Sequence, residues 1–134
     1  MVELTRKWSR RYARLAEAKL AQCDADIVLG PHFFTLAHLR CRQPLTIWGD
    51  STFAGLHNFY ADYSNLCAAS VRDGHAAEQA AQDRCAAVLY ASDWAAQTAI
   101  ERYHADPKKV HVVPFGANIE CSRTLADVQA LVAA

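Results

Sequence analysis

Four short apolar segments alternate with longer segments of helical composition, and this alternation constrains the fold more than any other feature of the sequence. Gly, Pro or Ser follows each apolar segment, as expected for buried strands that end in turns. Because the segments are apolar on both faces, they fit a parallel sheet covered by helices. The expected strands span residues 27–29, 44–48, 87–91 and 110–113.

The segments between these strands predict helices. Residues 4–23 contain strong helix formers and no Gly or Pro. A second long helix is expected over residues 69–86, with Ser70 as its N-cap, and a third begins at Ser92 or Asp93 and ends near residue 103. Shorter helices are expected over residues 32–39 and, with Ser122 as cap, 122–132, whereas residues 52–63 predict a loop with short helical pieces. With 134 residues the chain predicts one α/β domain.

The charge balance gives no reason to expect nucleic acid as a partner, because fourteen basic and fourteen acidic residues cancel. One local exception is a basic cluster near the N-terminus, which a helix would place largely on one face. A solvated helix face is the favoured interpretation of this cluster, and a phosphate or lipid site is the alternative. Its members are Arg6, Lys7, Arg10, Arg11 and Arg14.

The cysteines and the hydropathy pattern bear on the cellular location. The chain has five cysteines, an odd number, with no C-x-x-C pair, which favours reduced thiols in a cytoplasmic protein over disulfides or a zinc site. No stretch reaches the roughly 20 apolar residues of a membrane span. We therefore expect a cytoplasmic protein without a membrane span, for which peripheral membrane contact stays open.

Polar and glycine residues follow all four expected strands. In an open parallel sheet, ligands bind beyond the carboxyl ends of the strands, so these segments predict one binding crevice. Asp50 is the candidate catalytic residue, because its carboxylate could bond sugar hydroxyls or take a proton; a turn residue bonded to its own backbone is the alternative. The candidate substrate-binding residues are Ser51, Thr52, Ser92, Gly116, Ala117 and Asn118.

Other polar residues have simpler interpretations. For Ser92, capping of the following helix is favoured over anion binding. His32, His57 and His111 are expected to be surface or packed histidines more often than bases, and Glu78 is expected on a solvated helix face. The chain has no phosphate-binding loop, dinucleotide fingerprint, nucleophile elbow or metal-ligand spacing. We expect no cofactor and no metal.

The segment from Cys85 to Glu120 reads CAAVLYASDWAAQTAIERYHADPKKVHVVPFGANIE. It combines a strand, a Ser at a helix start, a helix ending near Tyr103, an Asp106-Pro107 turn, and a strand that ends in Val-Pro-Phe-Gly-Ala-Asn. This order resembles the last part of the N-terminal domain of group 1, or family 4, glycosyltransferases, which have the GT-B architecture. Residues 26–28, residues 47–53 and the helix containing Glu78 agree with the same family, so the resemblance covers about residues 24–120.

The resemblance implies a Rossmann-like domain on the acceptor side of a retaining, hexosyltransferase-type enzyme. In this family a C-terminal domain binds the nucleotide-sugar donor, and no residue here matches the basic pair or the glutamates of that domain. The Gly-rich loop that normally follows the first strand is also missing. We therefore expect residues 1–134 to form a partial N-terminal domain that is inactive alone, with a sugar acceptor and, through the second domain, a nucleotide sugar as partners. The alternatives are a non-catalytic sugar- or nucleotide-binding α/β module and a structural subunit.

Overall fold

The computed structural model describes residues 6–116 and 124–132. Its sheet has four parallel strands in the order β1-β2-β3-β4, so that each strand pairs with the next one along the chain. The bounds are Val28–Gly30 for β1, Leu45–Gly49 for β2, Cys85–Tyr90 for β3 and Val110–Val112 for β4. The expected α/β fold with a parallel sheet is confirmed, and the strand ends differ from the expected ones by one or two residues.

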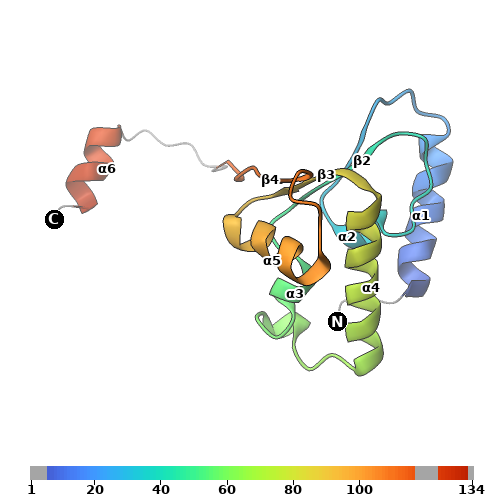
Figure 1. Cartoon of the computed structure of the whole chain (residues 1–134). Helices are drawn as coiled ribbons and strands as arrows, with labels where there is room; N and C mark the ends of the chain where they lie inside the picture. Colours follow the sequence, from blue (N-terminus) through green and yellow to red (C-terminus); the bar gives the residue numbers. More distant parts are fainter. Residues whose placement is uncertain (1–5, 117–123, 133–134) are drawn as a thin grey trace.

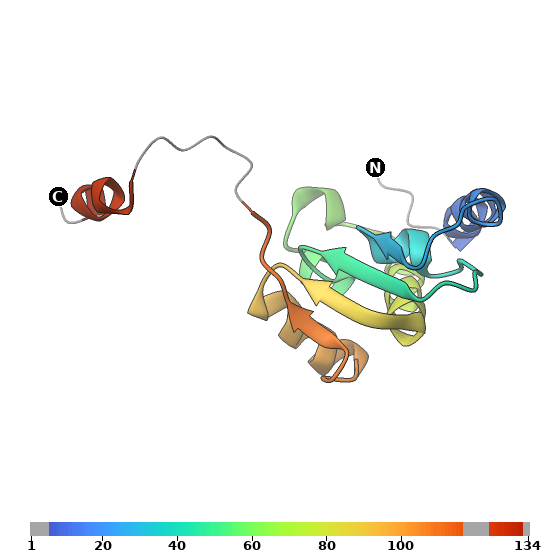
Figure 2. The same ribbon diagram turned by 90° about the horizontal axis from the view of Figure 1, so that it is seen from above.

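Helices α2 to α5 lie on one side of the sheet, below it in Figure 1, and Figure 2 shows the sheet from its other side. Helix α1 packs against α2 and α4. Trp48, Leu89 and His111, which are partners in the strand register, belong to the face that these helices leave uncovered. The helix bounds are Arg6–Leu20 (α1), Phe33–Leu36 (α2), Phe53–Leu56 (α3), Ala68–Arg84 (α4), Asp93–Tyr103 (α5) and Leu125–Val132 (α6), with a 3-10 turn η1 at Ala61–Tyr63.

The core lies between the sheet and these helices and is organised around Phe53. The Phe53 side chain is fully buried, and its ring packs edge-on against Phe33 with 6.2 Å between the ring centroids. Gly74 of α4 makes room for this ring, because a Cβ atom there would lie 2.5 Å from Phe53 Cζ. Burial of an aromatic ring of this kind contributes about 2–3 kcal/mol. Phe53 therefore fixes α3 against α4.

The helix caps agree with the sequence in one case and differ in another. The Ser92 hydroxyl accepts a hydrogen bond from the backbone N–H of Ala95, so the expected cap of α5 is confirmed. Ser70 is not the cap of α4, because the helix begins at Ala68 and Cys67 takes the extended N-cap conformation without a side-chain cap bond.

The last helix starts later than expected. The Asp127 carboxylate accepts the backbone N–H of Thr124, and the Thr124 hydroxyl accepts the backbone N–H of Asp127. These two bonds cap the first turn of α6. The expected cap, Ser122, lies outside the described residues.

Candidate functional site

The segments that follow the strands form one continuous edge. Ala91 donates its backbone N–H to the carbonyl oxygen of Gly49 at 2.9 Å, and Val113 donates to the carbonyl of Tyr90 at 2.8 Å. On the other side of Gly49, an added Cβ atom would lie 3.7 Å from the carbonyl oxygen of Pro31. The segments after β1, β2, β3 and β4 are therefore neighbours in space, as the parallel topology requires.

Asp50 lies at this edge and is exposed, as the first residue after β2. Burial lowers the pKa of His32, and the negative charge of Asp50 raises it in part. Burial raises the pKa of Tyr63, and the Asp50 charge raises it further. The Nδ1 atom of His32 accepts the backbone N–H of Phe34, so Nε2 carries the proton of the neutral ring. The charge of the Asp50 carboxylate thus acts on both the His32 imidazole and the Tyr63 phenol.

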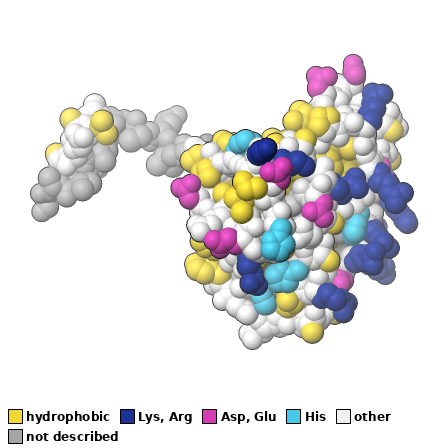
Figure 3. All heavy atoms as spheres, viewed as in Figure 1, with side chains coloured by type: hydrophobic (Ala, Val, Ile, Leu, Met, Phe, Trp, Pro, Cys, Tyr) yellow, Lys and Arg dark blue, Asp and Glu magenta, His cyan; other side chains and the backbone are white. Residues whose placement is uncertain are grey.

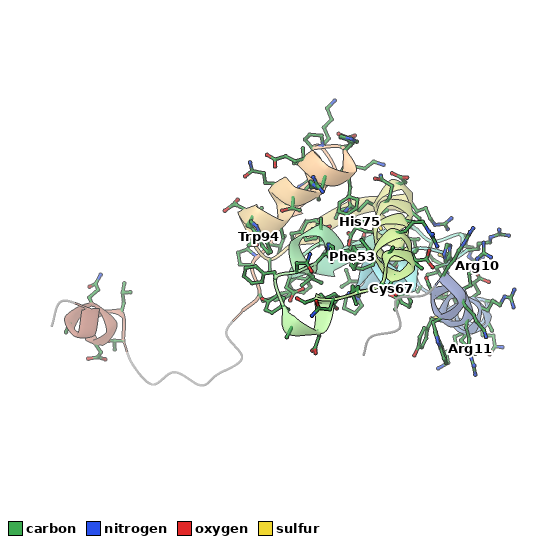
Figure 4. All side chains as sticks on the ribbon, turned by 90° about the horizontal axis from the view of Figure 1, so that it is seen from below. Arg10, Arg11, Phe53, Cys67, His75 and Trp94 are labelled. Atoms are coloured by element: carbon green, nitrogen blue, oxygen red, sulfur yellow. The ribbon has the colours of Figure 1, made fainter. Side chains whose placement is uncertain are left out.

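A serine hydroxyl and an indole ring both lie close to Gly55, in the segment that follows Asp50. An added Cβ atom on Gly55 would lie 2.6 Å from Ser51 Oγ and 2.8 Å from Trp94 Cη2. Only glycine therefore allows α3 to approach the start of α5 so closely. Trp94 is 49 % exposed at the beginning of α5, beside α3 (Figure 4). This pairing gives the edge an apolar ring next to polar groups, which suits the face of a sugar.

Trp48 ties the segment after β4 to the sheet. Its Nε1–H donates to the carbonyl oxygen of Val113 at 2.9 Å, and its ring packs edge-on against Phe115 with 5.1 Å between centroids. Phe115 is 51 % exposed, and an added Cβ atom on Gly116 would meet nothing within 4 Å. Gly116 therefore lies at an open rim, while Ala117 and Asn118 lie outside the described residues.

Two of the candidate hydroxyls serve as helix caps in this conformation. Thr52 is fully buried, and its hydroxyl accepts the backbone N–H of Gly55 at 3.1 Å. Ser92 is half-buried and caps α5. Thr52 therefore offers no surface to a substrate, and it acts on this edge by fixing the conformation that follows Asp50.

A hollow of about 440 Å³ opens between α3 and α5 next to this edge. Trp94 and Gly55 belong to its wall, so it adjoins the serine and indole pair. Polar side chains line it as well, among them His57, Glu101 and Arg102. The edge and the hollow together offer room for a group the size of a sugar.

The remaining histidines have packing or surface positions. The His57 ring stacks on Phe53 with 5.7 Å between centroids, and the His75 ring meets the same phenyl edge-on at 4.9 Å. His111 is exposed on β4. The expectation of packed or surface histidines agrees with these placements, whereas His32 shares its environment with Asp50.

The expectation that Glu78 lies on a solvated helix face is wrong. Glu78 is 1 % exposed, and its carboxylate accepts hydrogen bonds from the Phe53 backbone N–H, the Gln82 side-chain amide and the Tyr90 hydroxyl at 2.9, 2.8 and 3.2 Å. Burial raises the pKa of Glu78 to about 7 in spite of these three donors. Because Phe53 begins α3, Glu78 anchors the segment that carries Asp50, Ser51 and Thr52.

A signal for this burial exists in the sequence. Gly74 lies four residues before Glu78 and Ala81 three residues after it, and Ala77 lies three residues after Gly74, so these small residues share a helix face with Glu78 and allow close packing. All three are buried, so this face of α4 lies against the core. A glutamate on a stripe of small residues is therefore better assigned to the core than to solvent.

Within residues 6–116 and 124–132, no three His, Cys, Asp or Glu side chains are grouped as metal ligands. The cysteines described there, Cys23, Cys41, Cys67 and Cys85, are free thiols. No helix in these two ranges combines the length and the apolar character needed to cross a membrane.

The fold is an α/β domain of the Rossmann-like type, whose four post-strand segments lie together at the carboxyl edge of the parallel sheet. The chain belongs to Glycosyltransferase Family 4, whose family model matches residues 2–120. Among curated proteins, none matches the chain significantly. The family membership confirms the resemblance based on residues 24–120 and assigns a glycosyltransferase-type function in general terms.

Proposed function

We propose that this chain supplies the acceptor-binding wall of a two-domain retaining glycosyltransferase, which transfers a sugar from a nucleotide-sugar donor. The second domain binds the nucleotide, and the chain alone does not catalyse transfer. The rim at Gly116, with Ala117 and Asn118 beyond it, faces the donor side. The proposal includes no metal, since fixed positive charge and helix dipoles stabilise the leaving diphosphate.

The observation that carries this proposal is the convergence of all four post-strand segments at one edge. The charge of Asp50 there acts on His32, and Ser51 and the exposed ring of Trp94 both lie close to Gly55. Asp50 accepts a hydrogen bond from the acceptor hydroxyl and so orients it, while Trp94 packs against the sugar face. Each role depends on a side chain that is solvent-accessible in the free domain.

A sugar-transfer assay tests this division of labour. The chain is compared, alone and covalently joined to a donor domain of the same family, with a panel of nucleotide sugars and simple glycoside acceptors. We expect nucleotide release coupled to transfer only from the joined protein. Equal activity of the chain alone would contradict the division between the two domains.

Asp50 is tested in the joined protein by Asp50→Asn, with Asp24→Asn as the matched control. Asp24 is exposed and lies before β1, at the opposite edge of the sheet. Loss of an orienting group costs on the order of a hundredfold in transfer rate. We expect that loss for Asp50→Asn and an unchanged rate for Asp24→Asn, and equal rates for the two variants would remove Asp50 from the site.

The alternative of a non-catalytic nucleotide-binding module makes a different prediction. It requires the isolated chain to bind a nucleotide diphosphate such as UDP or GDP in calorimetry. If the chain is instead the acceptor-binding wall, neither nucleotide binds at this edge without the second domain. The two functions are therefore separated by one titration of the chain.

A further inference from the structure

A second cavity lies at the opposite edge of the sheet, away from the post-strand segments. It has a volume of about 450 Å³ and opens between α1, the segment after α2 and the last turn of α4. Arg84 of its wall immediately precedes β3, and Arg40 lies on the segment that leads into β2, which assigns the cavity to the amino edge of the sheet. Its ionisable wall residues are Arg10, Arg14, Glu17, His38, Arg40 and Arg84.

Positive charge dominates this cavity, with four guanidinium groups against one carboxylate. The Glu17 carboxylate accepts the backbone N–H of Arg40 at 2.8 Å. Within residues 6–116 and 124–132, one ion pair closer than 4.0 Å is found, between Arg72 and Asp73. The four arginines of the cavity form no such pair with a carboxylate in these ranges. Their charge is thus not neutralised by a described carboxylate at ion-pair distance.

The positive charge of the cavity affects His38, and a hydrogen bond positions Arg84. Burial lowers the pKa of His38, and the charges of Arg10, Arg6 and Arg84 lower it further. Arg84 donates a side-chain N–H to the carbonyl oxygen of Leu39, which directs its guanidinium group toward the segment after α2. The cavity therefore combines an imidazole of lowered pKa with at least one positioned guanidinium group.

Two of the basic residues of α1 line this cavity, and both also border a more open hollow along α1 that Arg11 shares. Lys and Arg side chains gather over α1 in Figure 3, and Arg10 and Arg11 leave the helix in different directions in Figure 4. Arg10 and Arg14 line the cavity. Arg11 does not, and its guanidinium carbon lies 5.3 Å from the centroid of the Trp8 ring. A solvated basic face accounts for Arg11 but leaves the convergence of arginines from α1, α4 and the segment between α2 and β2 unexplained.

We propose that the cavity formed by Arg10, Arg14, Arg40 and Arg84 binds a phosphate ester. Guanidinium groups match phosphate oxygens in a fork geometry, and a site built from three separate elements fixes several of them around one anion. The volume accommodates a phosphate with a small organic substituent. A soluble phosphate ester and the headgroup of an anionic phospholipid share this chemistry.

Two probes distinguish these sources. The first is sn-glycerol 3-phosphate, titrated into the full chain by calorimetry and by NMR of the His38 ring. The second is a set of vesicles with equal amounts of phosphatidylcholine and phosphatidylglycerol, compared with vesicles of phosphatidylcholine alone in a sedimentation assay. Saturable binding of the soluble ester identifies a soluble ligand, and binding confined to the phosphatidylglycerol vesicles identifies a headgroup.

The variant Arg10→Gln/Arg14→Gln tests the cavity, and Arg11→Gln is the control that removes charge from the same helix outside it. All three side chains are exposed, so we expect unchanged thermal unfolding midpoints. Loss of charge-assisted hydrogen bonds weakens binding about tenfold or more in the cavity variant, while Arg11→Gln changes it less than about twofold. Equal weakening by Arg11→Gln, or no binding of either probe, would overturn the proposal.

Discussion

The buried carboxyl of Glu78 makes the stability of the domain depend on pH in a defined direction. Its pKa is about 7 in the folded protein, against 4.5 for an unperturbed group, and burial is the main cause. Below about pH 4.5 the group is protonated in both the folded and the unfolded chain. Between pH 4.5 and 7 the unfolded chain loses this proton first, so ionisation favours unfolding, and stability falls as pH rises. The shift corresponds to about 3 kcal/mol.

The variant Glu78→Gln isolates this contribution because it keeps the size of the side chain and removes its ionisation. Urea unfolding of both proteins, measured at intervals from about pH 4 to pH 8, gives the difference in free energy of unfolding. We expect wild type minus variant to fall by about 3 kcal/mol between pH 4.5 and 7 and to be level outside this range. The amide also lacks one acceptor for the three donors around it, which adds an offset of about 1–3 kcal/mol at every pH.

The test depends on how the difference in free energy of unfolding changes with pH, and not on its constant offset. Glu101→Gln is the control, because Glu101 is an exposed glutamate on α5. It removes a carboxylate from the surface of the same domain, so the slope for Glu78→Gln is judged against the slope for Glu101→Gln in the same assay. A level or rising difference for Glu78→Gln between pH 4.5 and 7 would refute the argument that burial dominates the three hydrogen bonds.

Three further substitutions, the first with a control variant, test the packing and the caps through the thermal or urea unfolding transition. Gly74→Ala should destabilise by about 1–3 kcal/mol, because the new methyl group would overlap the buried Phe53 ring, whereas Gly116→Ala, which meets nothing, should be near neutral; equal effects would contradict this packing. Ser92→Ala should cost about 1 kcal/mol through loss of the α5 cap, and an unchanged midpoint would show that the cap contributes nothing. His104→Gly should stabilise by about 1 kcal/mol, because His104 ends α5 with φ 53° and glycine takes this conformation without strain; a loss of stability would contradict this.

The sequence was sufficient for the order of the elements. Apolar segments stopped by Gly, Pro or Ser gave all four strands, because a buried strand in a parallel sheet has no polar face and must end in a turn. The common edge of Asp50, Ser92 and Gly116 followed from the topology alone, since parallel strands have all their carboxyl ends on one side.

The burial of individual side chains near this edge could not be predicted from the sequence. The burial of Thr52 and Glu78 depends on how closely α3 approaches α4, and that approach depends on Gly74, which sits 21 residues after Phe53 in the chain. The cap of α4 was misassigned for a local reason, because Ser70 has the more favourable side chain but the backbone turns at Cys67. Propensity ranks candidate caps, whereas tertiary packing decides where a helix begins.

The cavity lined by Arg10, Arg14, Arg40 and Arg84 could not be predicted from the sequence either. Arg84 lies 70 residues after Arg14, and only the packing of α1 against α4 brings these two side chains to one cavity. Viewed along the chain, the basic cluster of α1 therefore favoured a solvated face. The phosphate or lipid alternative gains support only from the arginines that other elements contribute.

The most direct test of the central claim is to map where a sugar binds on this domain. Backbone NMR shifts of the labelled chain would be followed during titration with methyl glycosides of several hexoses. The account predicts saturable shifts concentrated at Asp50, Ser51 and Trp94, which Trp94→Ala reduces. Shifts concentrated on the amino edge around Arg40, or on the uncovered sheet face around His111, would contradict it.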